Sequence, residues 1–268
     1  MTTFAGRVAV VTGGANGMGR EFVRQLVQEG ARVATCDVDD AGLERLRAEH
    51  PTAQVARVDL GDASEREHFM TDVHAALGPV DLLVNNAGVG TAGAFVAIAG
   101  DDWTWIRSIN LDAPIDLMRL VLPEMKARGS GSILNVASMA GVTIQPYIAP
   151  YVATKHALFG LSRAVHEEVR HYGVTVTVGC PGFVRTGIMS RGRIRGLDLG
   201  GAMKLFRLGI EPDVAARRML AAVRRGKPVV VPNFDVRLMY LVYRVWPRGF
   251  DALVGRIAHR TYAEQLRD

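Results

Sequence analysis

Short apolar runs alternate with helical patterns along most of this 268-residue chain. The runs are rich in β-branched residues and cover 7–12, 32–37, 54–59, 82–85, 132–136, 174–179 and 229–231. Between them, apolar residues recur at helical spacing, as Phe22 and Leu26 do before Gly30. Continuously apolar strands that alternate with helices are typical of a parallel sheet covered by helices on both faces. The sequence therefore predicts a doubly wound α/β fold.

The length and composition fit one folded domain, because 49% of the residues are apolar and 22% are charged. The chain does not start with the basic head and apolar stretch of a secretory signal, and no apolar run approaches the roughly 18 residues that span a bilayer. Cys36 and Cys180 each lie in an apolar run, which favours buried free thiols in a reducing compartment over a disulfide. We therefore expect a cytoplasmic protein.

The net charge of +5 comes from the last third of the chain. Residues 185–268 hold 17 Lys and Arg against 7 Asp and Glu, whereas residues 1–184 hold 15 against 20. A uniformly basic surface would suggest a nucleic acid partner. The uneven distribution argues against one, and it assigns the basic balance to the C-terminal segment.

A glycine-rich stretch, residues 12–19, connects the first predicted strand to the first predicted helix. Glycines there let the backbone turn sharply and let a pyrophosphate approach, while the helix start offers unpaired N–H groups and a positive dipole end. A glycine cluster alone is a weak signal, but a position between strand and helix is the context in which it binds a dinucleotide. In this Rossmann-type arrangement we expect the cofactor to contact Gly13, Asn16, Gly17, Met18 and Gly19.

Asp37 ends the second predicted strand, about 20 residues beyond the glycines. A carboxylate there can accept hydrogen bonds from both adenosine ribose hydroxyls and would repel a 2′-phosphate. No arginine follows Asp37 at once, so the sequence favours NAD over NADP. The structural alternative for Asp37 is to cap the next helix, a role for which Asp39 and Asp40 compete.

Asp59 ends the third predicted strand and is followed by Leu60. Its carboxylate could accept a hydrogen bond from the adenine amino group, which would place both residues in the cofactor site. It could equally cap the following helix, although Asp62 is a competitor for that role.

Tyr151 and Lys155 are four positions apart near the start of a long helical pattern, so their side chains share one helix face. A neighbouring ammonium lowers the pKa of a phenol, and such a tyrosine can donate or accept a proton at a carbonyl or alcohol oxygen. The chain holds 28 arginines and four lysines, so a lysine here indicates a role for a compact ammonium.

Two further residues complete the predicted proton-transfer site. Ser138 follows the fifth predicted strand at its carboxyl end, where its hydroxyl could hold the substrate oxygen or merely stabilise a turn. Asn110 lies within a helical pattern and is half-buried by that pattern. It could hold a water that feeds protons toward Lys155, or it could cap a kink.

Together these residues resemble the short-chain dehydrogenase/reductase family in its short, single-domain, NAD-binding branch. The glycine motif matches it, as does the segment Asn85-Asn86-Ala87-Gly88 after the fourth strand, and Asn110, Ser138, Tyr151 and Lys155 match its catalytic tetrad in order. Residues 181–186 resemble its nicotinamide-side motif. The likeness covers residues 5 to about 190 and, more loosely, residues 211–232.

The resemblance implies a sheet of order 3-2-1-4-5-6-7 and hydride transfer between the nicotinamide and a secondary alcohol or ketone. Lys155, besides its catalytic role, would bind the nicotinamide ribose, and Val184 and Thr186 would lie at the carboxamide. The implied cofactor contacts also include Asn86, Gly88, Tyr151, Pro181 and Gly182. We expect one domain, residues 1–232 for dinucleotide binding and catalysis and residues 233–268 as its helical extension. The alternative is a catalytically silent NAD-binding scaffold or redox sensor, against which the intact Ser138, Tyr151 and Lys155 argue.

The substrate pocket should be formed by residues 89–94, 139–150 and 187–209, which are mostly apolar. Ile144, Tyr147, Ile148, Phe183 and Met189 suggest a hydrophobic ligand. Residues 187–209 hold six glycines and five Lys or Arg without a clear period, which is typical of a mobile loop or short lid helices. The scattered histidines predict no metal site.

The C-terminal segment departs from the family pattern. Residues 235–248 form a nearly all-apolar helix with Arg237, Arg244 and Arg248 on one stripe, and Pro247 is expected to end it. A second amphipathic helix follows, with one face predicted to carry Phe250, Leu253, Val254, Ile257 and Thr261. Such tails resemble those of family members that act on steroids, retinoids or other lipophilic substrates, some of them membrane-associated.

Three roles remain open for this tail. It could pack against its own domain and a partner subunit, wall a lipophilic substrate pocket, or lie on an anionic membrane with its arginines at the headgroups. Many tetrameric members end in a glycine-rich strand, which is replaced here, and this argues against the usual tetramer. We expect a homo-oligomer, either a homodimer or a homotetramer.

Overall fold

The computed structural model describes residues 3–187, 192–198 and 208–262. Its central sheet has seven parallel strands in the order β3-β2-β1-β4-β6-β7-β9. These strands are β1 (Val8–Thr12), β2 (Arg32–Asp37), β3 (Gln54–Arg57), β4 (Leu82–Asn85), β6 (Gly131–Val136), β7 (Val174–Gly179) and β9 (Val229–Val230). Counted along the chain, this is the order 3-2-1-4-5-6-7, so the predicted doubly wound sheet is confirmed.

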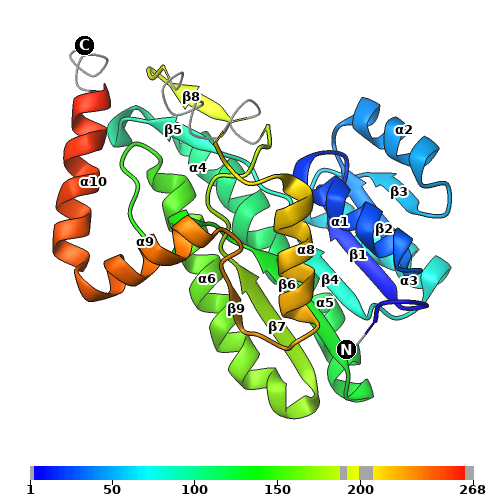
Figure 1. Cartoon of the computed structure of the whole chain (residues 1–268). Helices are drawn as coiled ribbons and strands as arrows, with labels where there is room; N and C mark the ends of the chain where they lie inside the picture. Colours follow the sequence, from blue (N-terminus) through cyan, green and yellow to red (C-terminus); the bar gives the residue numbers. More distant parts are fainter. Residues whose placement is uncertain (1–2, 188–191, 199–207, 263–268) are drawn as a thin grey trace.

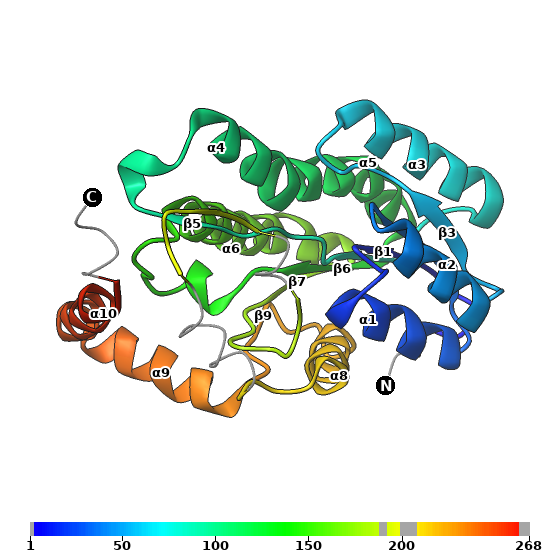
Figure 2. The same ribbon diagram turned by 90° about the horizontal axis from the view of Figure 1, so that it is seen from above.

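Helices cover both faces of the sheet, as Figure 2 shows with α3 and α5 on one side and α1 and α8 on the other. The helices are α1 (Gly17–Gln28), α2 (Asp40–Glu49), α3 (Ala63–Leu77), α4 (Gly100–Arg107), α5 (Ala113–Arg128), α6 (Ala149–Val169), α8 (Pro212–Val223), α9 (Phe234–Val245) and α10 (Pro247–Tyr262). A π-helical turn, Ser108–Asp112, joins α4 to α5.

Alternate residues of each central strand enter opposite cores. Val11 of β1 packs in the same cluster as Phe22 of α1, whereas Val10 packs in the other cluster with Phe69 of α3. Because both faces are covered, the strands are apolar throughout rather than alternating. Burying each such side chain contributes about 1.5–3 kcal/mol.

A second, two-stranded parallel sheet lies outside the main one and joins β5 (Thr91–Gly93) to β8 (Arg193–Arg195). The sequence predicted a loop or short lid helices for residues 187–209, so the strand in the described part of that range is a correction. Three residues are too few to show a period, and β8 exists because it pairs with a segment about 100 positions earlier. Residues 188–191 and 199–207 lie outside the described residues.

The C-terminal helices differ from the prediction in one respect. α9 ends at Val245, directly before Pro247, as predicted, but Pro247 also occupies the first turn of α10, so Arg248 lies on α10 and not on α9. The predicted second helix, α10, is present; of the residues assigned to its apolar face, Phe250 is buried while Leu253 and Ile257 are exposed. Figure 1 shows α9 and α10 at the edge of the molecule opposite α2 and β3. Within the described residues, no helix combines the length and the apolar character needed to cross a membrane.

Candidate active site

The glycine-rich loop between β1 and α1 leaves no room for side chains. Gly13 has φ +69°, and a Cβ on it would lie 2.9 Å from the Cα of Ala87, while a Cβ on Gly14 would overlap with the hydroxyl of Thr35. Asn16 precedes α1, but its side-chain oxygen does not cap the helix, and its amide nitrogen donates to the Oδ2 of Asp39 at 2.7 Å. The first turn of α1 therefore presents backbone N–H groups that can bind an anion.

Asp37 lies at the end of β2 beside this loop. Its Oδ2 accepts a hydrogen bond from the backbone N–H of Ala15 at 3.1 Å, and its Oδ1 accepts one from Val38 at 2.8 Å. Asp39, not Asp37, caps α2 by accepting from the N–H of Gly42. The capping alternative for Asp37 is therefore wrong, and its carboxylate is fixed next to the glycine loop.

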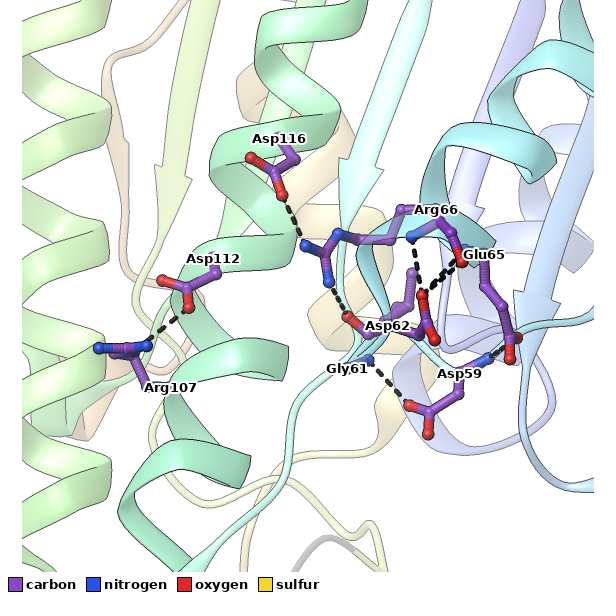
Figure 3. Close-up of polar contacts among 10 residues, drawn as sticks. Asp59, Gly61, Asp62, Glu65, Arg66, Arg107, Asp112 and Asp116 are labelled. Carbon is purple, nitrogen blue, oxygen red and sulfur yellow. Dashed lines mark hydrogen bonds and ion pairs between the residues drawn. The ribbon is translucent and has the colours of Figure 1, made fainter. Parts of the chain in front are cut away.

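Asp59 and Leu60 lie between β3 and α3, and Figure 3 shows Asp59 in this turn. The Oδ1 of Asp59 accepts from the N–H of Gly61 at 2.8 Å, while Asp62 caps α3 by accepting from the N–H of Ser64 at 2.7 Å. The exposed Asp59 therefore stabilises the turn and does not cap the helix. Leu60 is buried in the core.

Arg66 fixes this turn and was missed by the sequence analysis. Its guanidinium donates to the carbonyl of Leu60 at 2.6 Å and pairs with Asp116 of α5 at 2.6 Å, with only 5% of the arginine side chain exposed. The spacing of Arg66 from Phe69 and Val73 could have indicated that it is buried, because the three residues share the buried face of α3. A buried arginine at such a position needs polar partners.

The segment after β4 is tied to the end of β1. The hydroxyl of Thr12 accepts from the N–H groups of Asn86 and Ala87, both at 3.0 Å, and the Asn86 amide donates to the Thr12 carbonyl at 3.0 Å. This places Asn86 beside the glycine loop and directs the chain toward Gly88.

Asn110 lies in the π-helical turn and is fully buried, not half-buried as predicted. Its Oδ1 accepts from the N–H of Val89 at 2.8 Å and its amide donates to the Val89 carbonyl at 2.9 Å. A Cβ on Gly88 would lie 3.4 Å from both the Asn110 Oδ1 and the Lys155 Nζ. The wide turn, a feature often found at functional sites, thus brings Asn110 next to Lys155.

Tyr151 and Lys155 lie one turn apart on α6, beside the carboxyl end of β6. The Lys155 Nζ is 5.7 Å from the centroid of the Tyr151 ring and donates to the carbonyl of Val136 at 3.0 Å. Ser138 follows β6 and forms a side-chain hydrogen bond with Tyr151. The three residues that the sequence assigned to proton transfer therefore lie together.

Burial governs the protonation of this group. It lowers the pKa of Lys155 to about 8, although the nearby Cys180 thiol acts in the opposite direction. Burial also raises the pKa of Tyr151, and the hydrogen bond with Ser138 works against that rise. The prediction that the pKa of Tyr151 is lowered is therefore wrong, because the desolvation of the phenolate outweighs the contacts that stabilise it.

The segment after β7 lies against the glycine loop and is hydrogen-bonded by Asn233, which directly precedes α9. A Cβ on Gly17 would lie 3.0 Å from the methyl group of Thr186. The buried Asn233 accepts from the N–H of Gly182 at 3.0 Å and donates to the carbonyl of Phe183 at 3.0 Å. No sequence signal indicated this role for Asn233.

Three predicted substrate residues lie in the loop before α6. Ile144, Tyr147 and Ile148 are each half-buried, while Met189 lies outside the described residues. Tyr147 has φ +67°, its carbonyl accepts from the N–H of Gly93 in β5, and its ring meets that of Tyr262 at a centroid distance of 5.3 Å. The loop, β5 and the end of α10 therefore meet beside the predicted proton-transfer group.

Comparison with known proteins gives consistent likenesses. The sequence profile described as short chain dehydrogenase matches residues 7–194. The ketoacyl reductase HetN of Nostoc sp. is 29% identical over 264 residues, which are 94% of this chain and 90% of that protein. A short-chain dehydrogenase from Streptomyces avermitilis superposes with a TM-score of 0.82 at 26% identity over 100% of both chains. A short-chain dehydrogenase/reductase from Burkholderia phymatum in complex with NAD gives 0.80 at 27% identity, covering 91% of this chain and 96% of that one.

Proposed function

The chain belongs to the short-chain dehydrogenase family, and on that premise we propose that it transfers a hydride between NAD(H) and a secondary alcohol or ketone of a hydrophobic small molecule. The observation that carries the proposal is the meeting of Ser138, Tyr151 and Lys155 at the carboxyl end of β6. In open α/β sheets this end of the strands is where ligands bind.

The residues around the glycine loop fit a dinucleotide. The side-chain-free Gly13, Gly14 and Gly19 and the uncapped start of α1 would accept the pyrophosphate, with Asn16, Gly17 and Met18 beside it. Asp37 would hold the adenosine ribose, and its carboxylate, which would repel a 2′-phosphate, favours NAD over NADP. When bound, the nicotinamide would supply or accept the hydride.

Further proposed cofactor contacts follow from the same frame. The adenine would lie near Asp59 and Leu60, and the nicotinamide half would lie near the segments after β4 and β7. There the proposed contacts are Asn86, Gly88, Pro181, Gly182, Val184 and Thr186.

The acid–base work falls to residues of this chain. Tyr151 would donate a proton to the substrate oxygen in reduction and accept one in oxidation, while the Ser138 hydroxyl holds that oxygen. The pKa of Lys155 is about 8, so its ammonium is largely charged at neutral pH and stabilises the phenolate as it forms. Asn110 would position Lys155 through the segment that contains Gly88 and Val89.

Several observations support a hydrophobic substrate. Ile144, Tyr147 and Ile148, in the loop that leads into α6, and Phe183, in the segment after β7, are partly exposed apolar side chains. The arginines of β8 pair with Asp102 of α4, so they are already engaged by a carboxylate. A neutral ketone or alcohol suits this environment better than an anion.

The proposal is tested with Tyr151→Phe. We expect the variant to lose turnover by roughly 10²–10⁴-fold, because its ring has no proton to exchange. Its affinity for NADH should change by no more than about twofold, since the glycine loop is untouched. Turnover is followed by the absorbance of the reduced cofactor with a panel of ketones and alcohols, with NAD and NADP in parallel, and binding by NADH fluorescence.

Tyr172→Phe is the matched control, because Tyr172 is an exposed tyrosine at the far end of α6. Substantial activity in Tyr151→Phe would refute the assignment of the proton-transfer group. A wild-type protein that binds NADH but turns over no member of the panel would instead point to a catalytically silent scaffold.

A further inference from the structure

The outer face of α9 carries an apolar stripe that the described residues leave exposed. Five side chains recur at helical spacing i, i+4, i+7, i+8 and i+11, and we call them the outer stripe: Phe234, Leu238, Leu241, Val242 and Val245. At the ends of the stripe Phe234 is 78% exposed and Val245 is 86% exposed. The opposite face of α9 meets the core through the buried Val236 and the partly buried Tyr240. The outer stripe therefore leaves a large part of its apolar surface uncovered by the described residues, from 43% exposed at Val242 to 86% at Val245.

The apolar surface continues beyond α9. Trp246, between the two helices, is 61% exposed, and Leu253 and Ile257 of α10 are exposed by more than half. Both views place these helices along one edge of the molecule (Figures 1 and 2). Exposed apolar residues gathered on two contacting helices are typical of an interaction surface.

Five arginines lie on the same two helices as these apolar residues, and we call them the arginine rim: Arg237, Arg244, Arg248, Arg256 and Arg260. Asp235 and Asp251 are the acidic residues of the described parts of α9 and α10. Within the described residues, no rim arginine forms an ion pair with a carboxylate. Arg237 donates to the carbonyl of Val231, and Arg244 lies over the ring of Tyr240. The rim charges therefore remain available to an anionic partner.

We propose that the outer stripe and the arginine rim dock on an anionic lipid bilayer. An amphipathic helix that lies in a membrane interface combines inserted apolar and aromatic side chains with cations at the headgroup level, and α9 and α10 carry both. A second copy of this chain fits less well, because apposing the same face of two copies would bring two arginine rims together. The inference does not rest on the proposed catalytic activity.

Vesicle flotation of the full chain tests the proposal. We expect at least fivefold more protein bound to vesicles of 70% phosphatidylcholine and 30% phosphatidylglycerol than to phosphatidylcholine alone. Raising the salt from 0.1 to 0.5 M should release most of it, because headgroup attraction is screened. Equal binding to both vesicle types, or none to either, would overturn the proposal.

Two pairs of variants connect binding to the surface. Leu238→Asp with Leu241→Asp should abolish binding, while Leu120→Asp, at an exposed leucine of α5, should leave it unchanged. Arg244→Glu with Arg248→Glu should lower the partition coefficient by at least tenfold, on the order of fivefold per charge removed, and Arg119→Glu on α5 is its control. Equal losses in a test variant and its control would overturn the proposal.

A fluorescence measurement leaves the outer stripe intact, so it decides the question even if the stripe variants fail to fold. The chain has three tryptophans, and Trp103→Phe with Trp105→Phe leaves Trp246 as the reporter. We expect a blue shift of its emission with anionic vesicles only, and an unchanged spectrum would overturn the proposal. Light scattering gives a second outcome that would overturn the proposal: the wild type is an oligomer that does not bind vesicles, and the stripe variants are smaller. A second copy of the chain would then cover the outer stripe.

Discussion

Lys155 is a cation in an almost fully buried position, 3% exposed. Its ammonium is held by the carbonyl of Val136 and lies near the ring of Tyr151 and the amide oxygen of Asn110. A guanidinium is larger and stays charged at any working pH, whereas a buried ammonium can lose its proton. This explains why an arginine-rich chain carries a lysine here, and it makes Lys155 a source of pH-dependent stability.

Replacing Lys155 with methionine should reveal that dependence. The pKa of Lys155 is lowered in the folded protein to about 8 from 10.5, so between these values the unfolded chain binds more protons than the folded one. The free energy of unfolding of the wild type should therefore rise with pH across this window relative to Lys155→Met. The change should approach about 3 kcal/mol once the window is crossed. Urea unfolding of both proteins at pH 7, 8, 9 and 10 measures it.

Subtracting the free energies of unfolding of the two proteins also cancels an opposing pH effect, that of the buried Cys36 thiol. Burial raises the pKa values of the Cys36 and Cys180 thiols to about 12, which lowers stability above pH 9. The Cys36 effect is the same in the wild type and the variant, whereas Lys155 lowers the pKa of Cys180, so the Cys180 effect forms part of the difference between the two proteins. Lys126→Met, at an exposed lysine of α5, controls for the loss of a lysine as such. If the free energy of unfolding of the wild type did not rise relative to that of Lys155→Met between pH 8 and 10, the prediction would be contradicted.

At single positions, the sequence predicted residues whose partners are local or lie in a recognisable motif. The four-residue spacing of Tyr151 and Lys155 was sufficient to place them on one face, and Asp39 and Asp62 were recognised as competing helix caps. The direction of the Tyr151 pKa shift was not predictable, because it depends on how deeply the whole fold buries the phenol. Asn233 was missed because its partners lie about 50 residues earlier in the chain.

Among the secondary-structure elements, β8 depends most on distant contacts. Arg193 and Arg195 both pair with Asp102 of α4, whose side chain is 1% exposed, and Arg193 also lies over the Trp105 ring. A buried carboxylate requires such partners. The pairing therefore holds β8 against β5 and α4, next to the proposed substrate side.

Asp102→Asn should loosen β8 without unfolding the protein. The amide keeps the shape of the carboxylate but loses its charge, and the two arginines are half-exposed and can turn to solvent, so the global stability should fall by only about 1 kcal/mol. Trypsin should cut after Arg193 and Arg195 several times faster than in the wild type, as measured by mass spectrometry of the peptides.

Asp112→Asn is the matched control, because it removes the exposed ion pair with Arg107 (Figure 3). The hydrogen bond from Arg195, together with Arg193, lowers the pKa of Asp102 below 3.8. The contribution of the carboxylate is thus complete above that pH and is lost only as the pH falls through the lowered value, so cleavage of the wild type should not vary for this reason between pH 5 and 8. Equal cleavage of Asp102→Asn and the wild type would show that the tie does not hold β8.

At the scale of the whole molecule, the seven-stranded sheet was predictable because each of its strands is an apolar run between helices. The short β5 and β8 were not, since neither has a pattern that would exist without its partner. The C-terminal helices were predicted as helices, but Arg248 was assigned to the first helix and lies in the second, and the sequence left open which of their apolar residues are buried. Amphipathic pattern alone does not say which part of an apolar surface faces the core when the surface is nearly all apolar.

We propose that residues 233–268 extend the main domain and are not a separate unit, and two truncations test this. Ending the chain after Val245 removes α10 and should leave the sheet folded, with the thermal midpoint lowered by only a few degrees, on the order of 1 kcal/mol. Ending it before Asn233 also removes the two hydrogen bonds that the Asn233 side chain forms with the backbone of Gly182 and Phe183. It removes, too, the Val236 side chain that packs on Gly182. The loss should then be much larger, because buried backbone groups would be left without partners.

Asn233→Ala in the full chain separates the stability contributed by the Asn233 hydrogen bonds from that contributed by the packing of α9. Two buried hydrogen bonds are lost, so we expect a cost of about 2–4 kcal/mol, most of the difference between the two truncations. Differential scanning calorimetry of the four proteins, with the wild type as reference, measures the midpoints. If the two truncated chains unfolded at the same temperature, Asn233 would contribute nothing and the boundary at 232 would separate independent parts. If instead the shorter chain alone lost its cooperative transition, the edge of the sheet that carries the segment after β7 would depend on the extension for its folding.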